Sequence, residues 1–539
     1  MRRILCIGIA VLSSTAMAAF YNGVGPGFST IGATGPADYP SLSTALSQIQ
    51  NGPALTGGDW VLRIRTDLTE PSNLTFGKSN LNGNRLIIKP ETAASVTVKF
   101  TSSSGRAHLA IGTTSTLTDS SNGFVKTDNV IIDGSNNGTS SQNLTLLKDP
   151  LLGQLLPVVQ IVGNSDGCQV KNCSIRTVAP SPTGTTVIPA VQFASYYLSS
   201  QITDEYPDNG LVENNDILVG AYKFGSGVAA TAKNLNAFTE LPGAQAGIIV
   251  RNNRIVANRS GVELQNSRGA EVSSNTISVE QFDTVSDGYA IGIWHSGAGN
   301  TTSTDVNIFN NRILQVHGKR GAFLPVSGMV LGTRASGFSY NIYNNMVADV
   351  QITFGQEWVA GIYVAGTSTV AQSANVYNNS VHLSQRASGS AGYTPSCLSI
   401  PDSFPARTTN VVAKNNIFCM EETTGVCIYR TAPGSFTSDR NSFYLRLGSD
   451  ADLTAWRTQS GQDLNSTYAN PRVANPPAAG LWTSLSDHHF TAFPGTLFQG
   501  LPIAQVTTDI DGQTRNPVAP HKGADEIPAP ANVAGWAGY

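Results

Sequence analysis

The sequence predicts an all-β chain that folds as a right-handed parallel β-helix, a solenoid with an N-terminal capping helix and an irregular C-terminal cap. Two observations predict this fold: an asparagine phrase recurs along the chain, and a glycine phrase recurs a short distance before it. Repeats of a few dozen residues are typical of arrays in which each coil packs on its neighbours. The right-handed sense follows from the strong preference of parallel strand connections.

The asparagine phrase consists of an asparagine, an arbitrary residue and an apolar residue. It begins at Asn253, Asn275, Asn311, Asn345, Asn379, Asn416 and Asn441, with weaker copies at Asn172 and Asn215. Because stacked coils place equivalent residues roughly 4.8 Å apart, each buried amide can donate to the asparagine one coil away. The phrase therefore predicts an asparagine ladder in which Asn311, Asn345 and Asn379 stack at one turn.

The glycine phrase adds a second strand to each coil. Glycine followed by apolar residues occurs at Gly261, Gly292, Gly328, Gly361 and Gly425, and Cys397 takes the same slot. Successive residues of such strands face inward and outward in turn. Together the two phrases predict a β-helix over residues 55–446.

The first residues of the chain predict export. Two arginines precede an apolar run over residues 4–12, and residues 16–18 have the small-residue pattern of a cleavage site. We therefore expect residues 1–18 to be a signal peptide and the protein to be secreted, either extracellular or at the cell surface. No later run of about 20 apolar residues could span a membrane.

The N-terminal segment, residues 19–54, carries one clear helical pattern at residues 36–50. The apolar residues of one helical face are Leu42, Ala45, Leu46 and Ile49. The open end of a β-helix exposes strand edges and an apolar core, which must be covered. The segment is therefore predicted to cap the first coil.

Composition excludes one class of partner and leaves the cysteines open. Only 13% of the residues are charged and the net charge is −3, so nothing favours nucleic-acid binding. Cys419 and Cys427 flank a short turn, where either a disulfide or two plain buried thiols can be accommodated. No cysteine pair has the spacing of a zinc site, and no metal is expected.

The repeat stops before the C-terminal cap, residues 447–527, and residues 528–539 are expected to form a loose tail. Four acidic residues near the end of the cap have the carboxylate oxygens that calcium takes as ligands, namely Asp509, Asp511, Asp525 and Glu526. Arg515 and Lys522 lie close to them in sequence and favour a salt-bridge network instead. We therefore expect no cofactor, with calcium as the alternative.

Several stretches of the cap resemble a known family. Residues 455–466, 469–471, 509–515 and 523–526, together with residues 38–42, Ala45 and Leu46 of the helical segment, resemble secreted bacterial right-handed parallel β-helix proteins of the pectate-lyase-like superfamily. The resemblance implies the fold, and it leaves lyases, hydrolases, epimerases and members without an assigned reaction open. The chain has no Asp-Asp pair, which disfavours hydrolysis by paired carboxylates. If the protein is an enzyme, a polysaccharide lyase is favoured over a glycoside hydrolase.

The glycine-phrase strands place two aromatic residues on an outward face. Trp294 and Tyr363 lie two coils apart, roughly 10 Å by strand spacing, which is comparable to a disaccharide repeat. Arg268 and Arg334 follow the same strands. An aromatic platform flanked by guanidinium groups would bind a polysaccharide, and an acidic one in particular. The alternative is that the aromatic rings cover the sheet beneath a loop.

Catalytic candidates are few. Glu263 shares the outward face, Arg334 follows it, and His295 is adjacent to Trp294. Because His295 occupies a slot that elsewhere holds inward apolar residues, a buried and hydrogen-bonded histidine is the alternative to a catalytic one. His317 is assigned to a turn or loop.

A separate outward column precedes the asparagines. It contains Phe309, Tyr343 and Tyr377, whose rings are expected to stack on one another at the coil spacing.

These observations predict a secreted β-helix protein that binds extracellular or cell-wall polysaccharide, with lyase-type activity as an option. The alternative is a structural or adhesive cell-surface protein without a catalytic site. An exposed groove that combines basic and acidic side chains would favour the enzyme.

Overall fold

The computed structural model describes the chain from residue 20 to residue 527 with gaps, and the following statements concern the described ranges. These are residues 20–102, 107–113, 125–149, 156–177, 188–196, 206–220, 225–233, 245–281, 290–296, 305–318, 326–333, 338–352, 359–365, 371–384, 394–401, 408–471, 482–484, 487–490 and 495–527. The predicted signal peptide, the predicted tail and Arg334 lie outside them.

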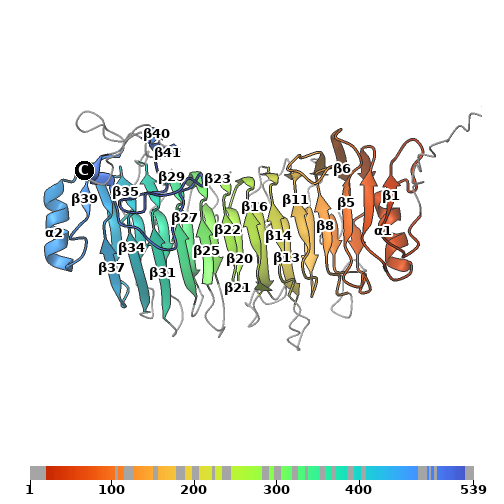
Figure 1. Cartoon of the computed structure of the whole chain (residues 1–539), viewed down its shortest axis with the longest axis horizontal. Helices are drawn as coiled ribbons and strands as arrows, with labels where there is room; N and C mark the ends of the chain where they lie inside the picture. Colours follow the sequence, from red (N-terminus) through yellow and green to blue (C-terminus); the bar gives the residue numbers. More distant parts are fainter. Residues whose placement is uncertain are drawn as a thin grey trace, which may run out of the picture.

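Three long parallel sheets run side by side along the molecule and form a right-handed parallel β-helix, as predicted (Figure 1). Each coil visits the first, second and third sheet in turn. Within the described ranges, the first sheet has 13 strands, the second 13 and the third 11. Strands of successive coils pair in parallel register, so each coil rests on the one before it.

The strands of the first sheet are β1 (Gly27–Ile31), β2 (Trp60–Ile64), β5 (Leu86–Pro90), β8 (Val130–Asp133), β11 (Gln169–Lys171), β14 (Leu211–Glu213), β18 (Ile249–Arg251), β22 (Glu271–Ser273), β25 (Asp305–Phe309), β28 (Ser339–Tyr343), β31 (Gln372–Tyr377), β34 (Thr409–Lys414) and β37 (Phe436–Asp439). Those of the second are β3 (Leu68–Glu70), β6 (Val96–Phe100), β9 (Leu144–Lys148), β12 (Cys173–Thr177), β15 (Asp216–Val219), β19 (Arg254–Ala257), β23 (Thr276–Glu280), β26 (Arg312–Gly318), β29 (Met346–Ile352), β32 (Ser380–Leu383), β35 (Ile417–Met420), β38 (Ser442–Leu445) and β39 (Thr467–Tyr468).

The strands of the third sheet are β4 (Leu74–Phe76), β7 (Leu109–Ile111), β10 (Val159–Val162), β13 (Ile188–Tyr196), β16 (Gly225–Lys233), β20 (Ser260–Gln265), β24 (Ile291–Ser296), β27 (Val326–Thr333), β30 (Val359–Val364), β33 (Ser396–Ile400) and β36 (Val426–Arg430). Two short pairs of strands lie outside the three long sheets, namely β17 (Gln245–Ala246) with β21 (Ser267–Arg268), and β40 (Trp482–Ser484) with β41 (Asp487–Phe490). The helices are α1 (Leu42–Asn51), α2 (Asp450–Ser460) and a 3-10 turn at Thr496–Phe498.

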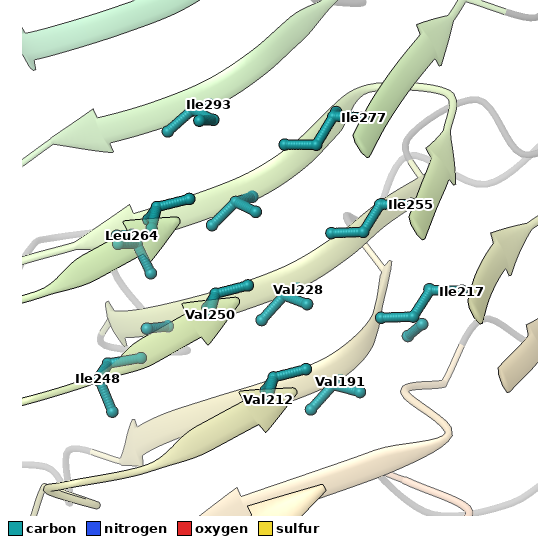
Figure 2. Packing of buried hydrophobic residues seen from close by; sticks show 14 of the residues in the cluster. Val191, Val212, Ile217, Val228, Ile248, Val250, Ile255, Leu264, Ile277 and Ile293 are labelled. Atoms are coloured by element: carbon teal, nitrogen blue, oxygen red, sulfur yellow. The ribbon is translucent and has the colours of Figure 1, made fainter. Parts of the chain in front are cut away.

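The core consists of aliphatic side chains stacked in columns along the axis. Ile217, Ile255 and Ile277 occupy equivalent positions of consecutive coils and are fully buried (Figure 2). The glycine phrase has a steric reason at Gly261, because a β-carbon there would lie 2.3 Å from Cγ2 of Ile277. The strand can therefore pass close to this column only without a side chain.

The asparagine ladder is confirmed. The side-chain amide of Asn311 donates to Oδ1 of Asn345 at 3.0 Å, and Asn345 donates to Asn379 at 3.0 Å. The same bond joins each neighbouring pair from Asn215 to Asn441. Asn172 lies one position outside this ladder, since Cys173 pairs in register with Asn215.

The residue before each ladder asparagine turns the chain from the first sheet to the second. It has a positive φ at Asn214, Asn252, Ser274, Asn310, Asn344, Asn378, Asn415 and Arg440. Asparagine adopts this left-handed conformation more readily than most residues, which explains the Asn-Asn pairs in the sequence. We call these residues the turn asparagines where they are asparagine.

The ends differ from the predicted boundaries in one respect. β1 precedes α1 and pairs with β2, so the first sheet begins at Gly27, inside the segment expected to precede the β-helix. α1 buries Leu42, Ala45, Leu46 and Ile49, the face that the sequence indicates. The domain limits themselves remain predictions.

The C-terminal segment, defined as residues 495–527, lies against the outer face of the second sheet. Its residue Phe498 packs with Ile417 and Cys419 of β35, and its residues Ile510 and Ala524 pack on Met346 of β29. The five described cysteines are buried, and no disulfide joins Cys419 to Cys427.

Candidate functional site

The outward residues of the third sheet form one continuous row in register. From the N-terminal coil onward the row consists of Gln160, Gln192, Ala229, Glu263, Trp294, Val330, Tyr363, Ser399 and Tyr429. Their strand neighbours Val262 and Leu264 point into the core. We call this set the outer row, and it contains three of the residues that the sequence singles out, Glu263, Trp294 and Tyr363.

Glu263 is the charged centre of the outer row, and it is only 1% exposed. Its carboxylate accepts hydrogen bonds from Arg259 Nη1 at 2.8 Å, Gln265 Nε2 at 2.8 Å and Ser260 Oγ at 3.3 Å. A buried carboxylate needs such partners, because desolvation without them would be very costly. The three donors hold Glu263 as an anchored anion whose oxygens are already engaged.

Arg259 connects this anion to the aromatic part of the row. Its guanidinium group lies over the ring of Trp294, 5.2 Å from the ring centre, and forms a cation–π contact. Trp294 is half-buried, so part of the ring reaches the surface. The sequence interpretation missed Arg259. The signal in the sequence was the i, i+4 spacing of Arg259 to Glu263.

The prediction of an exposed aromatic platform is wrong for one of its two rings. Tyr363 is 7% exposed and packs with Ile291, Val330 and Ala360, and Trp294 packs against the same cluster. Burial raises the pKa of Tyr363 well above its usual value. Val330 lies between the two aromatic positions and gives both rings an apolar surface to cover, which is favourable.

Only one of the two predicted arginines, Arg268, lies in the described part of the chain. Arg268 is half-buried in β21, whose partner strand is β17, and it lies past the end of β20. Arg334 is not among the described residues. Among the described residues, Arg259 places a guanidinium group against Trp294, and the roles of Arg268 and Arg334 stay predictions.

The N-terminal part of the outer row carries amides instead of charges. Gln160 Nε2 donates to Gln192 Oε1 at 2.6 Å, and Gln192 Nε2 donates to Thr231 Oγ1 at 2.9 Å. Gln192 and Thr231 are half-buried. Amides that bridge successive coils present both donors and acceptors, which are the groups that bind hydroxyl-rich ligands.

His295 has the geometry of the buried alternative. It is fully buried, with Nδ1 2.9 Å from the Tyr340 hydroxyl and Nε2 3.1 Å from the Ser267 carbonyl oxygen. Burial lowers its pKa to about 4, so the ring is neutral near pH 7. Both nitrogens are engaged inside the core, where a bound polymer has no access.

His317 lies in β26 and not in a turn or loop, so that assignment is wrong. Its Nε2 is 2.7 Å from Asp349 Oδ2 and 2.9 Å from Gln351 Nε2. The hydrogen bond from His317 lowers the pKa of Asp349. A β-bulge at Gln315 and Asp349, which both have positive φ, extends the strand past the predicted turn.

The four C-terminal acids do not converge on one point. Asp509 accepts three backbone N–H groups, Asp525 accepts the N–H of Phe490 at 2.6 Å, and Glu526 binds Arg515 at 3.2 Å. Of the predicted salt-bridge network, the ion pair between Arg515 and Glu526 is present. Lys522 takes no part in it, since its ammonium group donates to Thr467 Oγ1 and to the Leu497 carbonyl.

The ring stack predicted in the first sheet is confirmed for Phe309 and Tyr343, and it stays a prediction for Tyr377. Phe309 and Tyr343 lie 4.9 Å apart with planes inclined by 2°. Each ring thereby covers a face of the next, which leaves edges for contact with solvent and makes this column a poor platform for sugars.

No family model matches this chain, and no curated protein matches it. Solved structures with a similar course of the chain include the pectate lyase Pel9A, with 10% identity and a TM-score of 0.42 over 94% of this chain and 98% of that one. The complex of XylC with xylose has 10% identity and a TM-score of 0.42, over 93% and 98% of the two chains. DFA-IIIase from Arthrobacter chlorophenolicus A6 has 13% identity and a TM-score of 0.36, over 84% of this chain and 100% of that one.

Within the described ranges, neither α1 nor α2 has the length and apolar character that a membrane-crossing helix needs.

Proposed function

We propose that this protein is a secreted polysaccharide-binding β-helix protein whose ligand lies along the outer row of the third sheet, parallel to the long axis. One observation carries the proposal: amide, carboxylate and aromatic side chains follow one another coil by coil in a single register. If the repeat of a polymer is near twice the coil spacing of roughly 4.8 Å, each repeat unit would lie over two successive residues of the outer row.

Within the row, Trp294 is the proposed sugar contact. Its ring is half-buried and backed by the Arg259 guanidinium group, which is itself fixed by Glu263. A ring held in place by such a contact loses little entropy when a sugar packs on it. Gln192 and Thr231 would supply hydrogen bonds farther along the same polymer, and the half-buried Arg268 is the proposed contact for an acidic polymer.

The observation that favours binding without catalysis is that the Glu263 carboxylate already accepts hydrogen bonds from neighbouring side chains. It is the one carboxylate of the described outer row, and three donors already occupy it. A lyase-type reaction needs a group that is free to remove a proton. The non-catalytic adhesive protein is therefore the second candidate function, and lyase-type activity requires a base from outside this row.

Binding to a panel of acidic and neutral polysaccharides tests the proposal, with the absorbance of unsaturated products followed in the same samples. Trp294→Ala is expected to weaken binding to a polysaccharide that the wild type retains, and Tyr343→Ala, in the stacked column of the first sheet, serves as the matched control. Retention of the ligand by Trp294→Ala at wild-type affinity would remove the outer row from consideration. An increase in absorbance would establish cleavage and reject the purely adhesive candidate.

A further inference from the structure

Three different metal-binding side chains meet on the outer face of the second sheet, far from the outer row of the third. His382 of β32 pairs in register with Cys419 of β35. Glu421 follows Cys419 by two positions and so points to the same side. Strand register alone therefore brings an imidazole, a thiol and a carboxylate together.

The distances suit one small ion. The closest ligand atoms of His382, Cys419 and Glu421 all lie within 4.8 Å of one another, and His382 Nε2 is 3.8 Å from Glu421 Oε2. Four tetrahedral ligands at the usual zinc distances of about 2.0–2.3 Å are themselves roughly 3.5 Å apart. Small side-chain rotations would bring the three donors to that geometry.

The surroundings are closed on most sides. His382 and Cys419 are fully buried, whereas the Glu421 side chain is 16% exposed. The ring of His488 packs edge-on against the ring of His382 at 6.0 Å, and Phe490 and Phe498 pack beside Cys419. The site is thus covered by His488, Phe490 and Phe498 and opens toward solvent at Glu421.

We propose that His382, Cys419 and Glu421 bind a divalent transition-metal ion, with zinc as the best match to this ligand set. Thiolate and imidazole ligands select zinc over magnesium and calcium, which prefer oxygen. Cys419 binds as the thiolate, and its proton passes to the solvent when the ion enters. Three protein ligands leave a fourth position on the Glu421 side for water. The bound ion would join two coils directly beneath the C-terminal segment.

A second group of potential ligands, His489, Asp511 and Asp525, does not carry the same inference. Arg312 Nη2 is 2.5 Å from Asp511 Oδ1, and His489 Nε2 is 2.9 Å from Asp511 Oδ2. Asp487 and Asp511 both interact with His489. Burial alone would lower the pKa of His489, but the hydrogen bond to Asp487 and the charge of Asp511 outweigh it and raise the pKa. These groups already balance one another as a charge network.

Cobalt binding to chelator-treated full-length protein tests the proposal without reference to polysaccharide. The expected result is one Co²⁺ per chain with a thiolate-to-cobalt charge-transfer band, which Zn²⁺ abolishes by displacement. Cys419→Ser should lose the band. Two matched controls should keep it: Cys168→Ser removes another buried thiol, and Asp511→Asn alters the second group.

A wild-type protein that binds no cobalt, a band that persists in Cys419→Ser, or loss of the band in Asp511→Asn would each overturn the assignment. If Cys419→Ser does not fold, Glu421→Gln provides the test at a partly exposed position. It should fold and weaken zinc binding by at least the roughly 10- to 100-fold that outer-shell partners typically contribute. Unchanged zinc affinity in Glu421→Gln would contradict the proposal.

Discussion

The two ends of the β-helix are closed in different ways. At the N-terminal end, α1 buries four apolar residues against the first coils, and the carboxylate of Glu70 accepts the N–H of Leu42 at 2.7 Å. An anion at this position also favours the helix dipole. At the C-terminal end, α2 buries only Leu453 and borders a cavity of about 170 Å³ that is lined by residues such as Trp456 and Phe443.

The C-terminal end compensates through the C-terminal segment. Three turn asparagines hold it by their side-chain amides: Asn344 donates to Thr508 O at 2.6 Å, Asn378 to His521 O at 3.0 Å and Asn415 to Leu501 O at 2.6 Å. One end is therefore closed by a closely packed helix, whereas the other combines a loosely packed helix with a segment that hydrogen bonds hold along the outer face of the second sheet.

The largest expected effect concerns the packed end. Leu46→Asp places an unpaired charge against the first coils and should destabilise them by about 4–5 kcal/mol. Hydrogen exchange across α1 and β2 measures this directly. Leu464→Asp, at a residue that is 68% exposed, is the matched control and should change little. Equal protection in Leu46→Asp and wild type would show that α1 is not a cap.

The next effect concerns the hydrogen-bonded end. Arg515 is buried, and its guanidinium group binds Asn344 Oδ1 at 2.8 Å, Gly523 O at 2.8 Å and Glu526. Arg515→Met leaves the Glu526 charge without its partner and should cost about 3–5 kcal/mol.

Limited proteolysis within the C-terminal segment should accelerate in Arg515→Met, while α1 keeps its protection. Arg254→Met removes a surface pair with Asp216, and such pairs contribute at most about 1 kcal/mol. Loss of protection at α1 in Arg515→Met would mean that the two ends are not independent.

The pH dependence of the C-terminal end follows from Lys522. Burial lowers its pKa to about 7 from 10.5. Between these values the unfolded chain binds a proton that the folded chain does not, so the stability rises with pH by up to about 1.4 kcal/mol for each unit. Melting curves from pH 7 to pH 10 should show this rise in the wild type. Lys522→Met should flatten it, and parallel curves for the two proteins would contradict the assignment.

The smallest effect should differ in sign between the ends. Leu453→Phe extends into the cavity beneath α2 and should be neutral or stabilise by about 0.5–1 kcal/mol, as cavity filling commonly does. Leu46→Phe overfills the packed face of α1 and should destabilise by about 1–3 kcal/mol. Denaturant unfolding of both variants measures the contrast. A stabilising Leu46→Phe would mean that the N-terminal cap is packed as loosely as the other.

The sequence predicted the fold because its repeats record contacts between adjacent coils. Ladder asparagines such as Asn345 and core residues such as Ile277 occupy the same position in successive repeats, and both lie where the strand register places them. The turn asparagines were visible as Asn-Asn pairs, yet the partners of Asn344 and Asn378 could not be inferred, since they lie in a segment without a repeat. The register also placed Trp294 and Tyr363 in one row, but their burial depends on tertiary packing.

The bonds from the turn asparagines to the C-terminal segment also impose an order on folding. They join residues 164, 143 and 86 positions apart, whereas each coil pairs with the one just before it. Closing such long loops is slow compared with adding a coil to an existing stack. Synthesis also delivers the C-terminal segment after the coils to which it binds. Until it docks, Met346 and Ile417 remain on the surface, so an unfinished chain differs from a finished one by an exposed apolar patch that chaperones and proteases can recognise.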